Sequence, residues 1–224
     1  GGVRMDSGDL AYFSREARKI FDEAGLDYVK IVASNDVDEY VIDEVKHQNG
    51  AVDLWGIGTK VATCYDDPAL GGVYKLVEIE GEPKIKISSN IEKMTIPGKK
   101  QVFRVYDTED FMTGDIMEFF EKDGLEEGKV YDPLNPMRFY KLKNPARVEP
   151  LLKKKTLKGK TVGKLYDWQE ARENMEKDIT HLTQSSLRLL NPQNYKVSIS
   201  DAIYRLQNKL IEEFSSNNNN EKSG

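Results

Sequence analysis

Cysteine and histidine are scarce in this chain of 224 residues. Cys64 is the single cysteine, and the two histidines, His47 and His181, lie far apart in the sequence. One cysteine cannot form an internal disulfide, and neither histidine stands in the His-x-x-x-His or His-Glu-x-x-His spacing that holds zinc. We therefore expect a reducing, cytoplasmic setting, and we expect no metal site made by the protein's own side chains.

Long apolar runs are also missing. No stretch approaches the ~20 apolar residues that a membrane-spanning helix needs, and the net charge is −5. An acidic balance argues against nucleic acid or an anionic membrane as a partner. The lysine-dense segment 153–164 has no aromatic residues for base stacking, and we interpret it as a solvated loop. The 38% of hydrophobic residues are enough for a globular core.

Three short apolar runs begin at Val3, Val29 and Val52, with apolar residues at helical spacing between them. This rhythm predicts a βαβαβ unit with parallel strands, as in an α/β fold. The spacing of Asp36 and Glu39 resembles a capping box and predicts the start of the second helix. Because ligands of such folds bind at the carboxyl ends of the strands, the three following loops should meet at one mouth.

The loop after the third run has the composition of a phosphate site. Gly56-Ile57-Gly58-Thr59-Lys60 combines two glycines, a hydroxyl and a cation, and backbone N–H groups of such a loop can converge on an anion. The pattern alone is weak, because it matches neither the dinucleotide fingerprint nor the P-loop. A plain structural turn is an equally good interpretation of these residues.

The loop after the first run carries a cation and two carboxylates. Arg4, Asp6 and Asp9 stand there, and an arginine can hold a carboxylate or a phosphate with two parallel hydrogen bonds. A carboxylate can accept hydrogen bonds from a ribose diol. The structural alternative is a helix cap with a surface ion pair.

After Pro68 the apolar residues alternate with period two, which predicts an antiparallel β section. The expected strands are a hairpin of 73–79 and 84–87, then 102–106, 116–120 and 139–142. Two stripes at helical spacing follow, from Leu165 to Leu182 and from Ala202 to Phe214, and we interpret both as core-facing. The serine- and asparagine-rich segment from Ser215 predicts a disordered tail.

Four motifs stand in a fixed order: GVRMDSGDL from Gly2, VASNDVDE from Val32, WGIGT from Trp55 and PALGGVYKLV from Pro68. Together they closely resemble nicotinate phosphoribosyltransferase, and the likeness continues to the C-terminal helices. The resemblance implies the C-terminal part of an irregular α/β barrel of the type II phosphoribosyltransferase kind. Its last βα units would be residues 1–72, followed by the antiparallel β section 73–160, C-terminal helices in 161–214 and the tail 215–224.

The resemblance implies an activity in NAD biosynthesis. Members join nicotinate to 5-phosphoribosyl 1-pyrophosphate and release nicotinate mononucleotide and pyrophosphate, with coupled ATP hydrolysis. It also implies Mg²⁺ bound with pyrophosphate or ATP, ATP as a co-substrate, and a homodimer. Two alternatives stay open: a relative that uses nicotinamide, and a non-catalytic phosphate-binding or assembly module.

The resemblance assigns roles to named residues. Arg4 would lie against the nicotinate ring or its carboxylate, and Asp6, the candidate catalytic residue, would contact the ribose. The other candidates would line the phosphoribosyl pocket or hold the 5-phosphate: Ser34, Asn35, Gly56, Gly58 and Thr59. The family's phosphorylated histidine belongs to a motif upstream of the Gly-Val-Arg strand. We therefore expect this chain to be a C-terminal portion that is inactive alone.

Overall fold

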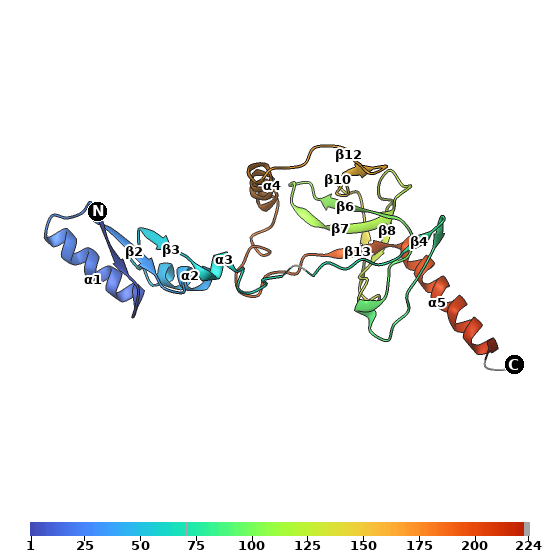
Figure 1. Cartoon of the computed structure of the whole chain (residues 1–224), viewed down its shortest axis with the longest axis horizontal. Coiled ribbons are helices and arrows are strands. Elements are labelled where there is room, and N and C mark those ends of the chain that lie inside the picture. Colours follow the sequence, from blue (N-terminus) through green and yellow to red (C-terminus); the bar gives the residue numbers. More distant parts are fainter. Residues whose placement is uncertain (70, 222–224) are drawn as a thin grey trace. The chain divides into compact units, whose positions relative to one another are not determined.

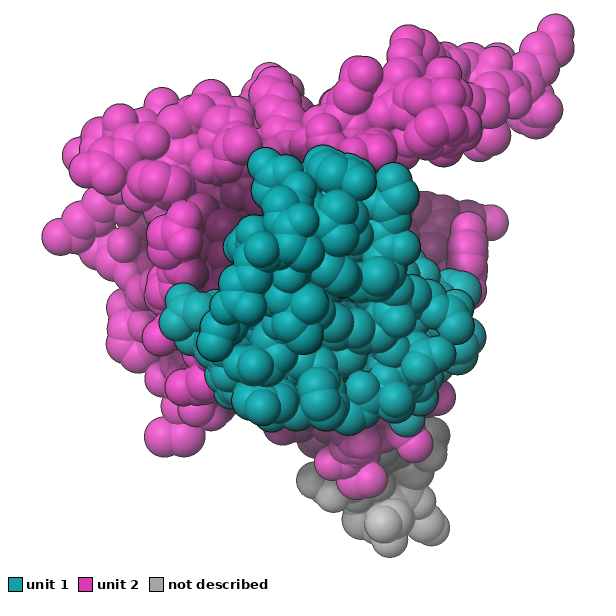
Figure 2. Space-filling view, turned by 90° about the vertical axis from the view of Figure 1, so that its left-hand side faces the viewer, with its two compact units in different colours: residues 1–73 teal, residues 74–224 magenta. Residues whose placement is uncertain are grey.

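The structure is a computed structural model that describes residues 1–69 and 71–221. The chain divides into two compact units, residues 1–73 and 74–224, which are coloured separately in Figure 2. Among the described residues no helix is long and apolar enough to cross a membrane. The two units differ in sheet type, and each is presented by itself.

Unit 1 is a three-stranded parallel sheet with helices between its strands, drawn in blue to cyan in Figure 1. The elements in chain order are β1 (Gly2–Met5), α1 (Leu10–Glu23), β2 (Lys30–Ser34), α2 (Glu39–His47), β3 (Leu54–Gly56) and α3 (Thr59–Ala62). Both strand pairs are parallel, and the strand order is β1-β2-β3. The predicted βαβαβ unit is confirmed.

The core of unit 1 lies on one face of this sheet. Ile31 and Ala33 of β2 are completely buried, whereas Val32 and Ser34, which alternate with them, are partly exposed. Helix α1 packs against β1 and β2. The carboxylate of Asp53 ties β2 to β3, because it accepts a hydrogen bond from the Ile31 backbone N–H at 2.8 Å. That hydrogen bond, with help from Lys30, lowers the pKa of Asp53.

The start of α2 differs from the sequence prediction. The capping residue is Asp38, whose carboxylate accepts a hydrogen bond from the Val41 backbone N–H at 2.9 Å. Asp36 has φ of 45° and lies in a turn with Asn35, which has φ of 88°. Two residues in the left-handed region delay the helix, so the expected Asp36 cap is wrong by two positions.

Unit 2 is built on a six-stranded sheet of order β10-β6-β7-β13-β8-β9. Its strands are β6 (Lys100–Tyr106), β7 (Met112–Phe119), β8 (Gly128–Tyr131), β9 (Phe139–Leu142), β10 (Arg147–Pro150) and β13 (Val197–Ser200). All neighbours are antiparallel except β13 and β7, which are parallel. Val105, Ile116, Val130 and Leu142 form a buried cluster in this sheet.

Strand β13 corrects the predicted organisation. It comes from the segment where the sequence predicted only helices, and it lies between β7 and β8. The antiparallel section of residues 73–160 is therefore completed by a strand from the C-terminal part. This segment forms a strand because its side chains are buried inside unit 2: Ile199 is completely buried, and Ser198 and Ser200 are nearly so.

The smaller elements of unit 2 are short. The predicted hairpin is present but reduced to β4 (Glu78–Ile79) and β5 (Glu82–Pro83). A 3₁₀ turn, η1 (Ile91–Lys93), precedes the large sheet. A second hairpin pairs β11 (Thr156–Leu157) with β12 (Lys160–Thr161), inside the segment interpreted as a solvated loop.

The two C-terminal helices are α4 (Trp168–Thr180) and α5 (Asp201–Glu221). Helix α5 packs on β7, β8 and β13. Helix α4 buries none of its residues, and Trp168 is 70% exposed, so its stripe is not core-facing within unit 2. The predicted tail begins at Ser215, but α5 continues through Glu221 because neither glycine nor proline interrupts it. Residues 222–224 of that prediction lie outside the described residues.

Candidate active site

The carboxyl ends of the three parallel strands lie at one edge of the unit 1 sheet. Met5 is opposite Ala33, and Ala33 is opposite Trp55. One step further, Ser34 is in register with Gly56. The three predicted loops therefore leave the sheet side by side, as expected from the parallel arrangement.

The first loop carries an ion pair that is open to solvent. Arg4 Nη2 lies 3.0 Å from Asp6 Oδ2, and the two side chains are 68% and 56% exposed. An exposed pair of this kind adds little stability, so both groups can turn to a ligand at small cost. Asp9 has the structural role instead, because its carboxylate caps α1 by accepting a hydrogen bond from the Tyr12 backbone N–H at 2.9 Å.

The second loop is conformationally unusual. Ser34 ends β2, and the next two residues, Asn35 and Asp36, both have positive φ. Non-glycine residues in this region carry some strain, which is often found at ligand-binding turns. The turn leaves the exposed Asn35 at the same strand end as Ser34.

The third loop approaches the second closely. A Cβ atom on Gly56 would lie 3.2 Å from the Ser34 Cβ, so glycine allows the two strand ends to come together. Gly58 precedes the single turn of α3, and no side chain caps that turn. Residues 56–59 are exposed, so this loop offers backbone N–H groups and the Thr59 hydroxyl to a ligand.

A second ion pair, which the sequence interpretation missed, joins the second and third loops. Lys60 Nζ lies 3.4 Å from Asp38 Oδ2, and the side chains are only 24% and 18% exposed. The same amine lies 3.7 Å from the centroid of the Tyr65 ring, a cation–π geometry. The Val41 N–H, with help from Lys60, lowers the pKa of Asp38. The sequence showed Lys60 as a cation next to the glycine loop, but nothing in it indicated that Asp38 would be its ion-pair partner.

The ion pair also borders a cavity of about 370 Å³, which the start of α2, α3 and the segment after α3 line. Four acidic side chains contribute to its walls: Asp38, Glu39, Asp66 and Asp67. Within the described part of the chain, however, no group of three or more His, Cys, Asp or Glu residues could hold a metal ion. His47 contacts Asp43 one turn earlier in α2, and His181 contacts Asp110, which is distant in the sequence.

This chain is similar to known proteins in both sequence and fold. Residues 99–207 match the family described as nicotinate phosphoribosyltransferase C-terminal domain. Over 216 residues, 91% of this chain, the sequence is 38% identical to nicotinate phosphoribosyltransferase 2 of Arabidopsis thaliana. The resemblance to nicotinate phosphoribosyltransferase is confirmed. Over 108 residues, 46% of the chain, identity to the Bacillus subtilis nicotinate phosphoribosyltransferase reaches 56%.

The fold agrees with the sequence match. The crystal structure of human nicotinic acid phosphoribosyltransferase superposes with a TM-score of 0.71 at 30% identity, over 94% of this chain and 40% of that one. The chain spans 38% of the Arabidopsis protein and 22% of the Bacillus protein. The similarity to nicotinate phosphoribosyltransferases thus includes both units, while the relatives are considerably longer.

Proposed function

We propose that this chain is part of a nicotinate phosphoribosyltransferase acting in NAD biosynthesis. The enzyme would join nicotinate to 5-phosphoribosyl 1-pyrophosphate and release nicotinate mononucleotide and pyrophosphate, with coupled ATP hydrolysis. One observation carries the proposal: the motif loops at Arg4–Asp6, Ser34–Asn35 and Gly56–Thr59 leave neighbouring strands at one sheet edge. The similarity to named nicotinate phosphoribosyltransferases supports it further.

The reaction forms a bond between the nicotinate nitrogen and ribose C1 while the bond from C1 to the pyrophosphate oxygen breaks. Positive charge develops on the sugar and negative charge on the leaving group, so groups that stabilise these charges accelerate the step. Asp6 would face the developing positive charge at the ribose. Arg4, whose guanidinium is mostly exposed, would bind the nicotinate carboxylate through two parallel hydrogen bonds.

The glycine loop would hold the 5-phosphate. Backbone N–H groups in a concave loop and a hydroxyl are suited to a phosphate group, and here they would come from Gly56, Gly58 and Thr59. Ser34 and Asn35 would line the rest of the phosphoribosyl pocket. The Asp38–Lys60 ion pair would keep the two loops at a fixed separation, because a well-positioned substrate reacts faster than a loosely held one.

Mg²⁺ would enter with the pyrophosphate group or with ATP. This ion usually binds through one or two carboxylates together with substrate phosphates, and Asp6 offers one carboxylate at the proposed mouth. The described residues supply no larger ligand group. Parallel strands with helices on one face support the further proposal that unit 1 belongs to an irregular α/β barrel. A cytoplasmic homodimer without nucleic acid or membrane partners completes the proposal.

The base preference tests this function in the complete enzyme. We expect nicotinate to outcompete nicotinamide, and we expect Arg4→Ala to lower kcat/KM for nicotinate about tenfold to a hundredfold, since charge-assisted hydrogen bonds contribute roughly 1.5–3 kcal/mol. Lys19→Ala, an exposed position on α1, is the control and should leave kcat/KM unchanged. A preference for nicotinamide, or an unaffected Arg4→Ala variant, would overturn the proposal.

The 224-residue chain by itself should form no nicotinate mononucleotide from nicotinate, phosphoribosyl pyrophosphate and ATP. The similarity extends over no more than 40% of the human protein's length, and the histidine motif of the family has no counterpart in this sequence. Chromatographic detection of the product checks this expectation. Robust turnover by residues 1–224 would show that the whole active site is contained in them.

A further inference from the structure

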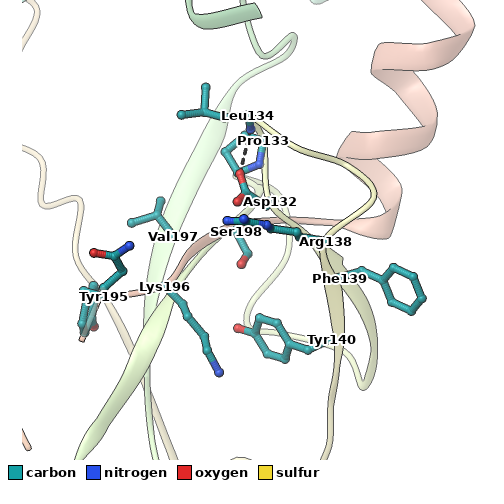
Figure 3. A pocket seen from close by; sticks show the side chains of 11 residues that line it. Asp132, Pro133, Leu134, Arg138, Phe139, Tyr140, Tyr195, Lys196, Val197 and Ser198 are labelled. Atoms are coloured by element: carbon teal, nitrogen blue, oxygen red, sulfur yellow. Dashed lines mark hydrogen bonds between the residues drawn. The ribbon is translucent and has the colours of Figure 1, made fainter. Parts of the chain in front are cut away.

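A cavity of about 850 Å³ lies in unit 2, between the loop before β9 and the start of β13 (Figure 3). Its lining includes Arg138 and Tyr140 on one side and Lys196 on the other. A volume of this order is typical of sites for small ligands. None of the residues assigned to the phosphoribosyltransferase reaction lines it.

Arg138 is distinctive among the arginines of the described residues. Each of the others forms an ion pair or donates to a carbonyl; their partners are Asp6, Gln48, Asp22, Asp115, Asp110, Glu176, Ser185 and Asp201. Within the same residues, the Arg138 guanidinium has no ion-pair or hydrogen-bond partner. In Figure 3 it points into the group of lining side chains, whereas the neighbouring Phe139 ring points away.

Lys196 adds a second cation without a carboxylate partner in the described chain. Its amine lies 5.0 Å from the centroid of the Tyr140 ring, so both side chains face the same space (Figure 3). The one acid of the lining, Asp132, has a local role: its Oδ1 accepts hydrogen bonds from the backbone N–H groups of Leu134 at 2.8 Å and Asn135 at 3.2 Å. Neither cation forms an ion pair with it.

Apolar side chains stand beside these charges. Leu134 and Val197 line the same cavity and are 54% and 48% exposed. Arginine recognises planar or tetrahedral oxyanions with its fork of donors, and lysine adds a point charge. Two unpaired cations match a dianion better than a monoanion, and exposed apolar groups match a ring or an apolar body.

We propose that this cavity is a second ligand site of the protein, which takes a phosphate monoester carried on an aromatic or apolar body. Arg138 and Lys196 hold the phosphate, the Tyr140 hydroxyl donates to it, and Leu134 and Val197 pack against the body. The proposal is independent of the proposed function, because it uses no residue of unit 1.

Calorimetric titration of the 224-residue chain with AMP tests the proposal, with adenosine and benzoate as the uncharged and the carboxylate probe. AMP should bind saturably, adenosine should not bind detectably, and benzoate should bind more weakly than AMP. Arg138→Gln and Lys196→Gln should each weaken AMP binding about tenfold or more, as expected for a lost charge-assisted hydrogen bond. Lys141→Gln, an exposed lysine on β9 that does not line the cavity, should have no effect.

Two further variants make the result decisive. Arg138→Lys keeps the positive charge and loses the two parallel donors of the guanidinium, so it should bind AMP with intermediate affinity. It replaces Arg138→Gln in the test if the glutamine variant fails to fold. Gly58→Ala alters the glycine loop of unit 1 and should leave AMP affinity unchanged. The proposal is overturned if AMP does not bind saturably, if the Arg138 and Lys196 variants bind normally, if benzoate binds more tightly than AMP, or if Gly58→Ala alone abolishes binding.

Discussion

The two units show contrasting ways of building a sheet. In unit 1 every strand pairs with its neighbour in sequence, so the sheet order is the chain order. In unit 2 the strand between β7 and β8 is β13, and its Val197 is in register with Asp115 of β7. The loops of unit 1 that we propose to bind the substrate are thus brought together by local repetition, whereas the core of unit 2 depends on a contact between distant segments.

The largest expected effect follows from this dependence. Replacing Ile199, which is completely buried on β13, by alanine should lower the free energy of unfolding of unit 2 by about 2–5 kcal/mol, the usual range for such a cavity. Native-state hydrogen exchange checks the effect unit by unit. The Ile31 and Ala33 amides of unit 1 should keep their protection.

Val197→Ala provides the matched control for this experiment, because Val197 lies on the same strand but is about half exposed. It should destabilise unit 2 clearly less than Ile199→Ala does. Equal loss of protection in both units would contradict the assignment of Ile199 to a core that belongs to unit 2 alone.

A smaller effect is expected where the backbone of β7 approaches the segment before β13. Gly114 has φ of 156°, and a Cβ there would lie 2.8 Å from the Lys196 carbonyl oxygen. Gly114→Ala should therefore push this segment away and cost about 1–3 kcal/mol, as overpacking does. Urea denaturation measures it, with Gly124→Ala, where a Cβ meets open space, as the control. Equal midpoints for the two variants would refute this reading of the strand insertion.

In unit 1 the second and third loops are joined by the Asp38–Lys60 ion pair. The pKa of Asp38 is lowered in the folded state, so its ionised form stabilises the fold above the unfolded pKa near 4, and this contribution is lost as pH falls through the lower folded pKa. Asp38→Asn keeps an oxygen to cap α2 but removes the charge opposite Lys60. Its melting temperature should be below that of the wild type at pH 7, and the difference should shrink on acidification.

Asp27→Asn is the control for that series, because Asp27 is exposed and forms no ion pair among the described residues. Its melting temperature should follow the wild type at every pH. A difference between wild type and Asp38→Asn that grew towards low pH would give the opposite sign and exclude this role for the ion pair.

The last predicted effect on stability concerns Lys100 in unit 2, where burial lowers the pKa of the amine to about 8. Between about pH 8 and the unfolded value near 10.4, the unfolded chain binds more protons than the folded one, so stability should rise with pH. Lys100→Met should lack this increment. Denaturation at pH 7.5 and 9.5 compares the two, with Lys141→Met expected to behave like the wild type; a parallel increase in the Lys100 variant would rule the effect out.

The sequence was most informative where structure is local. The three strands of unit 1 were predicted close to their observed positions, because each apolar run ends in a recognisable loop. Strand β13 was missed because a four-residue strand has a weak signal and its burial depends on β7 and β8. The stripe of α4 indicated a helix correctly, but periodicity does not tell whether an apolar face is covered.

In the candidate site, too, the features set by local sequence were predicted and the contacts between separate loops were not. The motif order placed Arg4, Ser34 and Gly56 at one sheet edge, because parallel strands align their ends. The Asp38–Lys60 ion pair could not be predicted, because its two residues stand on different loops and meet only in the folded chain. The sequence could not single out Arg138 for a similar reason, because only the structure shows which positively charged side chains have no ion-pair partner.

The central claim is that the glycine loop of unit 1 holds the sugar phosphate. The most direct measurement compares Thr59→Val and Thr63→Val in the complete enzyme, because both threonines lie on or next to α3 but the Thr63 hydroxyl donates to the Thr59 carbonyl oxygen at 2.8 Å. Thr59→Val should raise the KM for phosphoribosyl pyrophosphate about tenfold, the value of one good hydrogen bond to a charged group, and Thr63→Val should leave it unchanged. Equal KM values for wild type and Thr59→Val would contradict the claim.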